Sequence, residues 1–144
     1  MDRTEISALL DHDRAEWEAL VAALEAYPDV SLHDPASPTW TSRDVYAHLA
    51  RWMAVSTSHL ESEMAGRLHQ QIEGSDDEIN ARWQTEDSAL SLDDARARSE
   101  YRRRIEAIES VPDDRWDDAL DKIAHADGAG HYAAHRSFIV VARP

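Results

Sequence analysis

The sequence predicts an all-α protein, a single domain built as a bundle of four long helices. Over long stretches, apolar residues recur at three- and four-residue steps, the spacing of one face of an α-helix. Only 4 glycines and 5 prolines interrupt the chain, and no useful stretch alternates between apolar and polar residues as a strand would. A length of 144 residues fits one domain with one core, which we expect to span residues 1–144.

The first helix is expected from about Thr4 to Ala26. Its inward stripe comprises Ile6, Leu9, Leu10, Trp17, Leu20, Val21 and Leu24. Asp13 falls within this stripe, where a carboxylate is usually explained by a helix end or a partner arginine; supporting a ligand group is the alternative. Pro28 ends the helix, and the proline-containing residues 30–39 predict a connecting loop.

The second helix is expected to begin at Thr41, which can cap the free amides while Asp44 bonds back, with Trp40 placed to pack as a hydrophobic staple. Its inward stripe comprises Val45, His48, Leu49, Trp52 and His59. His48 therefore lies among apolar residues, and either a neighbouring carbonyl or a metal ion would satisfy its ring. His59 lies about 16 Å further along the helix axis, too far to share an ion with His48, and is predicted to line a pocket rim or the surface.

The middle of the chain predicts a short helix, capped by Ser75 or Asp76, and a third long helix from Ser91. The short helix passes through Ile79, Asn80 and Trp83, and the long one is expected to carry Leu92, Ala95, Ser99, Ile105 and Ile108 inward. Arg102, Arg103 and Arg104 are flanked by acidic residues, and we interpret them as a solvated face. Residues 111–116 predict a break before the last helix.

The last helix, from Asp118 or Leu120 to Val141, is expected to carry a histidine pair. His131 and His135 are four residues apart, so they lie one turn above each other on the same face, which continues to Phe138 and Ile139. Gly128 and Gly130 fall within this helix, where each costs about 0.5–1 kcal/mol relative to alanine. Close helix packing, or room for a ligand beside His131, would offset that cost.

The three inward histidines suggest a metal site. In a four-helix bundle neighbouring axes lie about 8–10 Å apart, so an imidazole on the second helix can meet two on the last. His48, His131 and His135 would supply three ligands, at about 2.0–2.1 Å for zinc, and leave a position open for water or substrate. A metal ion there would lower the pKa of a bound water or thiol.

Four further residues could serve such a site. Trp52, Tyr132 and Asn80 are candidate pocket-wall residues. Asp127 lies one turn before His131 and could orient its ring; a solvated or arginine-paired carboxylate is the alternative. No catalytic residue beyond the ion ligands is apparent.

Charge and cysteine content restrict the partners and the compartment. A formal net charge of −14 disfavours nucleic acid and anionic membrane surfaces as partners. Cysteine is absent, which excludes disulfides, a thiolate nucleophile and a cysteine-based zinc site, and fits a cytoplasmic setting. The N-terminus lacks the basic region and apolar run of a signal peptide, and no segment approaches membrane-spanning length.

Two segments carry a resemblance to a known family. Residues 40–49, which include His48, and the pair His131 and His135 followed by Arg136 resemble the DinB/YfiT-like superfamily, which includes the mycothiol-dependent maleylpyruvate isomerases. Residues 77–80, 91–95 and 111–116 are most similar to its ClbS/DfsB-type branch. The resemblance covers nearly the whole chain.

The resemblance implies a four-helix up-and-down bundle with a short extra helix in the link between helices two and three, often as a homodimer. It further implies a divalent metal, commonly zinc or nickel, held by His48, His131 and His135. The co-substrate would be a low-molecular-weight thiol such as mycothiol or bacillithiol. Members of the ClbS-type branch do not uniformly keep all three histidines, and one of them is a hydrolase that opens a reactive cyclopropane in a genotoxin.

Three functions follow as hypotheses. The first is a metal-dependent hydrolase or thiol S-transferase that detoxifies an electrophilic small molecule. The second is a metal-independent hydrolase or sequestering protein of the ClbS type, with the histidines lining an apolar pocket. The third is a non-catalytic helical module whose histidines are satisfied inside the fold.

Overall fold

The computed structural model describes residues 1–27, 40–90 and 93–141, and within these ranges it contains helices and no strand. The elements are α1 (Arg3–Ala26), α2 (Ser42–Met64), α3 (Asp76–Ser88), α4 (Ala95–Glu109), a 3-10 turn (Asp113–Arg115), α5 (Asp118–His125) and α6 (Ala129–Val141). The all-α prediction is confirmed. The predicted loop 30–39 and the predicted helix start at residues 91–92 lie outside the described residues. None of the described helices is both long and apolar enough to span a bilayer.

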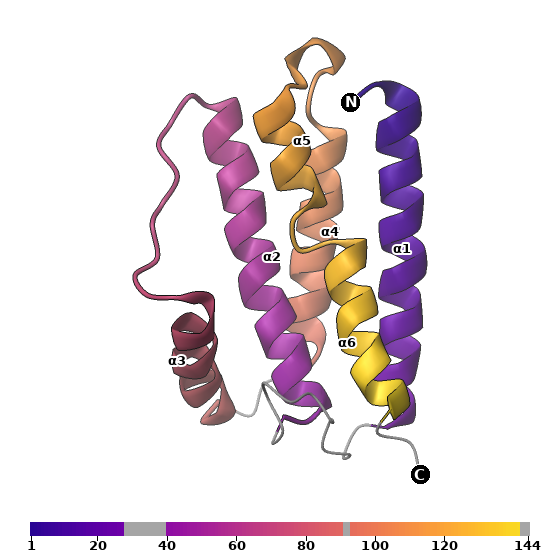
Figure 1. Ribbon diagram of the computed structural model, residues 1–144, viewed down its shortest axis with the longest axis vertical. Coiled ribbons are helices and arrows are strands. Elements are labelled where there is room, and N and C mark those ends of the chain that lie inside the picture. Colours follow the sequence, from indigo (N-terminus) through magenta and orange to yellow (C-terminus); the bar gives the residue numbers. More distant parts are fainter. Residues whose placement is uncertain (28–39, 91–92, 142–144) are drawn as a thin grey trace.

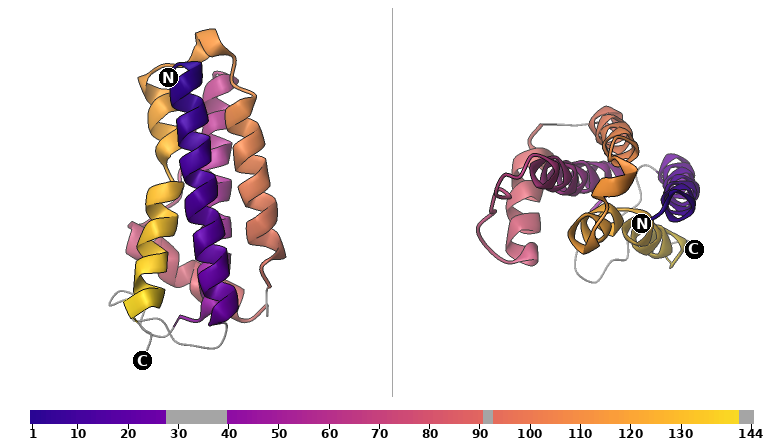
Figure 2. Two further views of the ribbon diagram at one scale, coloured as in Figure 1. Left: turned by 90° about the vertical axis from the view of Figure 1, so that its right-hand side faces the viewer. Right: turned by 90° about the horizontal axis from the view of Figure 1, so that it is seen from above.

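The long helices form four columns, made by α1, α2, α4 and the end-to-end pair α5 and α6 (Figure 1, Figure 2). The short helix α3 lies against the outer side of α2. The link 65–75 and α3 return the chain along α2, so α2 and α4 run in the same direction (Figure 1). The long link and its extra helix are as predicted, but the columns do not alternate strictly up and down.

Side-chain caps fix where the helices begin. The Asp44 carboxylate accepts a hydrogen bond from the Thr41 backbone N–H at 2.9 Å, the predicted reciprocal cap of α2. Ser75, rather than Asp76, caps α3, because its hydroxyl accepts from the Glu78 N–H at 3.2 Å. The cap of α2 therefore sets the register of the face that carries His48.

Apolar side chains form two separate cores, one in each half of the bundle. The lower core, named for its place in Figure 1, comprises Trp17, Leu20, Val21, Leu24, Trp40, Val45, Tyr46, Leu49, Ala50, Met53, Ala97, Tyr132 and Ile139. The upper core comprises Ile6, Leu9, Leu10, Leu60, Ile108, Val111, Leu120 and Ala124. The predicted stripe of α1 is confirmed, and it is divided between the two cores.

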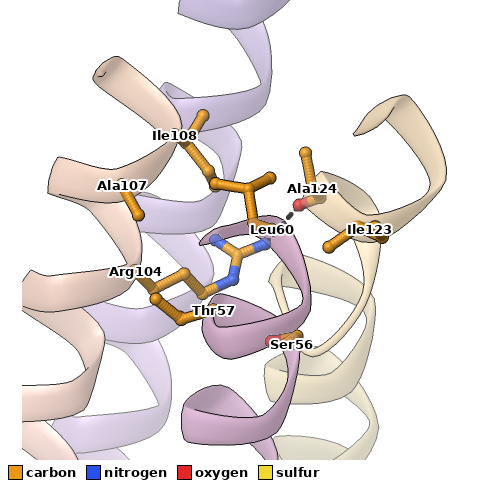
Figure 3. Close-up of a pocket in the computed structure, with 8 residues that line it drawn as sticks. All are labelled: Ser56, Thr57, Leu60, Arg104, Ala107, Ile108, Ile123 and Ala124. Carbon is orange, nitrogen blue, oxygen red and sulfur yellow. Dashed lines mark hydrogen bonds between the residues drawn. The ribbon is translucent and has the colours of Figure 1, made fainter. Parts of the chain in front are cut away.

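A buried ion pair lies between the two cores. Asp13 on α1 and Arg104 on α4 are 3% and 2% exposed, and the guanidinium bonds the carboxylate directly. Arg104 Nη2 also donates to the carbonyl of Ala124 at 2.5 Å and to that of Ala126 at 3.3 Å (Figure 3). The interpretation of residues 102–104 as a solvated face is wrong for Arg104, which is the partner arginine that the position of Asp13 called for.

The register of α4 explains this error. Its buried residues are Ala97, Arg104 and Ile108, which recur at seven and four positions and so share one face. The prediction had placed Ala95 and Ser99 inward, and both are exposed. That register turned Arg104 outward.

The predicted last helix is interrupted, which corrects the prediction of one helix to Val141. α5 ends at His125 and α6 begins at Ala129, with Asp127 between them in the left-handed region at φ 56°. A Cβ on Gly128 would lie 2.5 Å from Arg104 Nη2 and 2.7 Å from Asp13 Oδ1, so only glycine fits against the ion pair. Close packing, one of the two predicted reasons, therefore accounts for Gly128; a Cβ on Gly130 would meet nothing within 4 Å.

A small cavity of about 10 Å³ adjoins the ion pair and is lined by Thr57, Arg104 and neighbouring apolar side chains (Figure 3). The Thr57 hydroxyl is buried and has no hydrogen-bond partner among the described residues. We expect Thr57→Val, which keeps the side-chain volume, to raise the free energy of unfolding by about 1 kcal/mol, because it removes an unpaired buried hydroxyl. Urea unfolding would measure this change. A loss of stability would mean that the hydroxyl is hydrogen-bonded in solution.

Candidate metal centre

The three histidines that the sequence singled out meet between α2 and α6. His131 Nε2 lies 3.0 Å from His48 Nε2 and 3.1 Å from His135 Nε2. One nitrogen from each ring lies within 4.8 Å of the other two. No other group of three or more histidine or carboxylate side chains with this metal-ligand proximity occurs among the described residues.

Local packing fixes the three rings. His131 and His135 are one turn apart on α6, and the helix is fastened to α1 by an ion pair between Arg136 and Glu16 at 2.8 Å. The His48 ring packs against Trp40, with ring centroids 4.9 Å apart, just before the α2 cap. The sequence places each ring through helical spacing and capping, and tertiary contacts then hold the two helices together.

The start of α6 is also held by the buried ion pair. Asp13 Oδ1 accepts a hydrogen bond from the Ala129 N–H at 2.8 Å, two residues before His131. Arg104 binds two carbonyls of the preceding turn. Asp13 and Arg104 therefore set where the histidine-bearing helix begins. Sequence reasoning noted Asp13 in its apolar stripe, but it did not find its contact with α6.

The close approach of the three nitrogens is suited to a shared cation. An imidazole nitrogen offers one in-plane position, either an N–H or a lone pair. His131 Nε2 has two nitrogen neighbours at about 3 Å, so it cannot form a full hydrogen bond with both. Nitrogen ligands around an ion at about 2.0–2.1 Å are separated by about 3.0–3.4 Å, which matches the two short distances. The group could therefore hold a metal ion.

The electrostatic environment keeps the rings in the neutral form that a metal requires. Burial, followed by the neighbouring imidazoles of His135 and His131, lowers the pKa of His48 to about 2, and an interaction with Asn80 partly opposes this shift. Burial and the nearby His131 lower the pKa of His135 to about 3. Neither ring carries a proton charge near pH 7, so each has a lone pair available as a ligand.

Asp127 lies beside the outer nitrogen of His131, as its position one turn earlier predicted. Its Oδ1 is 3.5 Å from His131 Nδ1. That Nδ1 is buried and has no hydrogen-bond partner among the described residues. A small movement of the Asp127 side chain would supply an acceptor, which would fix the tautomer that leaves Nε2 free.

The three candidate pocket-wall residues have different surroundings. Trp52 Nε1 donates to Asn80 Oδ1 at 2.7 Å, which joins α2 to α3 beside His48. Tyr132 is fully buried in the lower core, where its hydroxyl donates to Met53 Sδ at 3.2 Å. Its ring is therefore engaged in core packing, and a role for any of the three in binding a substrate stays a prediction.

Fold and site together define a small helical bundle with a candidate three-histidine metal centre. Comparisons of the chain with protein-family models, with curated proteins and with solved structures gave no match. The functional argument therefore rests on the residues themselves.

The lowered pKa values predict that the metal-free protein loses stability in mild acid. In the unfolded chain His48 and His135 take up protons near the ordinary pKa of 6.5, whereas the folded protein keeps both neutral down to about pH 3. The unfolded state then binds more protons, so the free energy of unfolding falls as the pH drops below 6.5. Each ring contributes on the order of 1.4 kcal/mol per pH unit.

Urea unfolding between pH 7.5 and 5 would measure this slope. The double variant His48→Gln with His135→Gln should flatten it relative to the wild-type protein. An equal slope in the two proteins would show that other groups cause the acid sensitivity.

Proposed function

We propose that the protein is a metal-dependent enzyme of the DinB/YfiT-like type, in which His48, His131 and His135 hold a divalent ion, zinc or nickel. The observation that carries this proposal is the convergence of three imidazole nitrogens from two helices, two of the separations being 3.0 and 3.1 Å. When bound, the ion supplies Lewis acidity that lowers the pKa of a water or thiol in its open position.

The chain's own residues would bind and orient. Burial of His48 and His135 keeps the donor nitrogens unprotonated and excludes competing water. Asp127 would accept the Nδ1 proton of His131 and hold that ring in its ligating tautomer. Asn80, which interacts with His48 and accepts from Trp52, would fix the second helix's ligand from the side of α3.

The reaction that we propose is hydrolysis of an electrophilic small molecule, or transfer of a low-molecular-weight thiol such as mycothiol or bacillithiol to it. The protein would act in the cytoplasm, as a detoxifying enzyme and possibly-shared homodimeric bundle is not needed for the three ligands, since one chain supplies all of them. The net charge of −14 argues against nucleic acid and membrane partners.

Elemental analysis tests the proposal most directly. Protein stripped with EDTA and then dialysed against zinc or nickel should regain one ion per chain. Loaded protein should then consume members of an electrophile panel, with or without added thiol, faster than stripped protein does. Failure to take up any divalent ion would overturn the metal-dependent mechanism, and uptake without any turnover would reduce the site to a binding module.

A further inference from the structure

A second pocket lies beside the candidate metal centre, where α2, the link 65–75, α3 and the start of α4 meet. It has a volume of about 340 Å³, within the range of small-molecule sites. Its walls include the apolar side chains of Val55, Ile72 and Trp83 and the guanidinium groups of Arg51 and Arg96. The pocket therefore combines a flat apolar wall with a cationic end.

The two guanidinium groups converge on one buried carboxylate. Arg51 Nη2 lies 2.7 Å from Asp87 Oδ1, and Arg96 Nη1 lies 3.9 Å from the same atom. Asp87 is 5% exposed, so it balances one of the two charges in a partly desolvated setting. Glu86 also contacts Arg51, but it is 51% exposed and its charge is screened by solvent. One positive charge thus remains at this end of the pocket.

The hydrogen-bonding groups of the two arginines are used unequally. Arg51 donates through Nε and Nη2 to Asp87 and through Nη2 to Glu86, which holds its guanidinium in place and leaves Nη1 uncommitted. Arg96 forms no hydrogen bond with any described residue, and its side chain is 45% exposed. A carboxylate that entered the pocket could be bound bidentately by such a planar fork.

The pocket is one helical turn from the candidate metal centre. Arg51 follows His48 by three residues on α2, and Trp83 follows Asn80 by three on α3, each a step of about 4.5 Å along the axis. Trp52 bridges the two regions, because it donates to Asn80 and its ring contacts that of Trp83 edge-on at 5.0 Å. A ligand in the pocket would therefore lie near the residues that surround His48.

We infer that this pocket binds the carboxylate end of a small aromatic or similarly flat acid, with the carboxylate on Arg96 and Arg51 and the apolar body against Trp83. The inference deepens the proposed function and rests on it in one respect, since it assigns this acid as the substrate class of the three-histidine centre. In a chain with a net charge of −14, a cationic pocket with an apolar wall selects such an acid over neutral or purely inorganic ligands.

Calorimetric titration with benzoate tests the inference, with benzamide as the neutral analogue and inorganic phosphate as the anion without an aromatic ring. Benzoate should bind saturably and at least about tenfold more tightly than either of the other two. Arg96→Gln should weaken benzoate binding by at least about tenfold. The matched control is Arg102→Gln, an exposed arginine on the same helix outside this pocket, which should leave benzoate binding unchanged.

The titrations are made on both metal-loaded and EDTA-stripped protein, because benzoate could also ligate a metal ion. Benzoate binding that persists after stripping, and in the variant His135→Ala, supports the pocket. Binding that vanishes on stripping, or that responds equally to Arg96→Gln and Arg102→Gln, overturns it. If benzoate binds but the wild-type protein takes up no metal, the pocket stands while its link to the metal centre and the proposed function fail.

Discussion

His135→Ala is expected to abolish the uptake of one divalent ion per chain. The substitution leaves two nitrogen ligands of the three that now lie within 4.8 Å of one another. Loss of a group that merely orients a ligand typically costs 10–100-fold in metal affinity, so loss of a ligand should cost more than about 100-fold. Chelator competition would measure the affinity. Zinc at a hundredfold excess over its Kd should stabilise the wild-type protein by about 2.7 kcal/mol and leave the variant unchanged.

The control for this experiment is His59→Ala on the same helix. His59 stacks on His69 with ring centroids 4.6 Å apart and lines the second pocket, where the sequence had predicted a pocket-rim residue. It is not part of the three-histidine group, so its removal should leave metal uptake intact. Retention of the ion by His135→Ala, or an equal loss in both variants, would contradict the assignment of the ligands.

Asp13→Ala is expected to have the largest effect on stability. It would leave the Arg104 guanidinium buried without its carboxylate and the Ala129 N–H without its acceptor. Breaking a buried ion pair in this way typically costs about 3–5 kcal/mol, a large part of the total stability of a domain. For a domain of this size Tm should fall by roughly 10 °C or more. Thermal unfolding followed by circular dichroism would measure the shift.

A double variant separates stability from positioning of the metal centre. Asp13→Leu combined with Arg104→Met replaces the buried charges with apolar groups, and such replacements often restore stability. The variant still lacks the hydrogen bonds that hold residues 124–129, so its metal affinity should remain below that of the wild-type protein. Wild-type metal affinity in the double variant would show that the ion pair does not position α6.

The sequence was sufficient to predict the helical fold and the meeting of the histidines, because both follow from local rules. Helical spacing puts His131 and His135 on one face, and the cap at Thr41 sets the register of His48. Their approach to one another requires only that the two helices be neighbours in a bundle. That the group holds an ion is a matter for the metal analysis described above.

The interrupted last helix and the buried arginine depend on tertiary contacts, which is why the sequence did not predict them. The periodicity of residues 118–141 continues through the break, and the left-handed conformation of Asp127 has no local signal as clear as a glycine would give. Arg104 follows two arginines that lie on other faces, so composition suggested a solvated patch. Only its pairing with Asp13, 91 residues away in sequence, makes its burial favourable.

The division of the apolar interior has a consequence for how this chain can diversify. The upper core contains neither the three histidines nor any lining residue of the arginine-lined pocket, so it contributes to folding without constraining chemistry. Substitutions around the lower half could then alter ligand preference while the other half keeps the bundle assembled. Related chains would be expected to differ most where α3 faces α2, and least around the ion pair that joins the two halves.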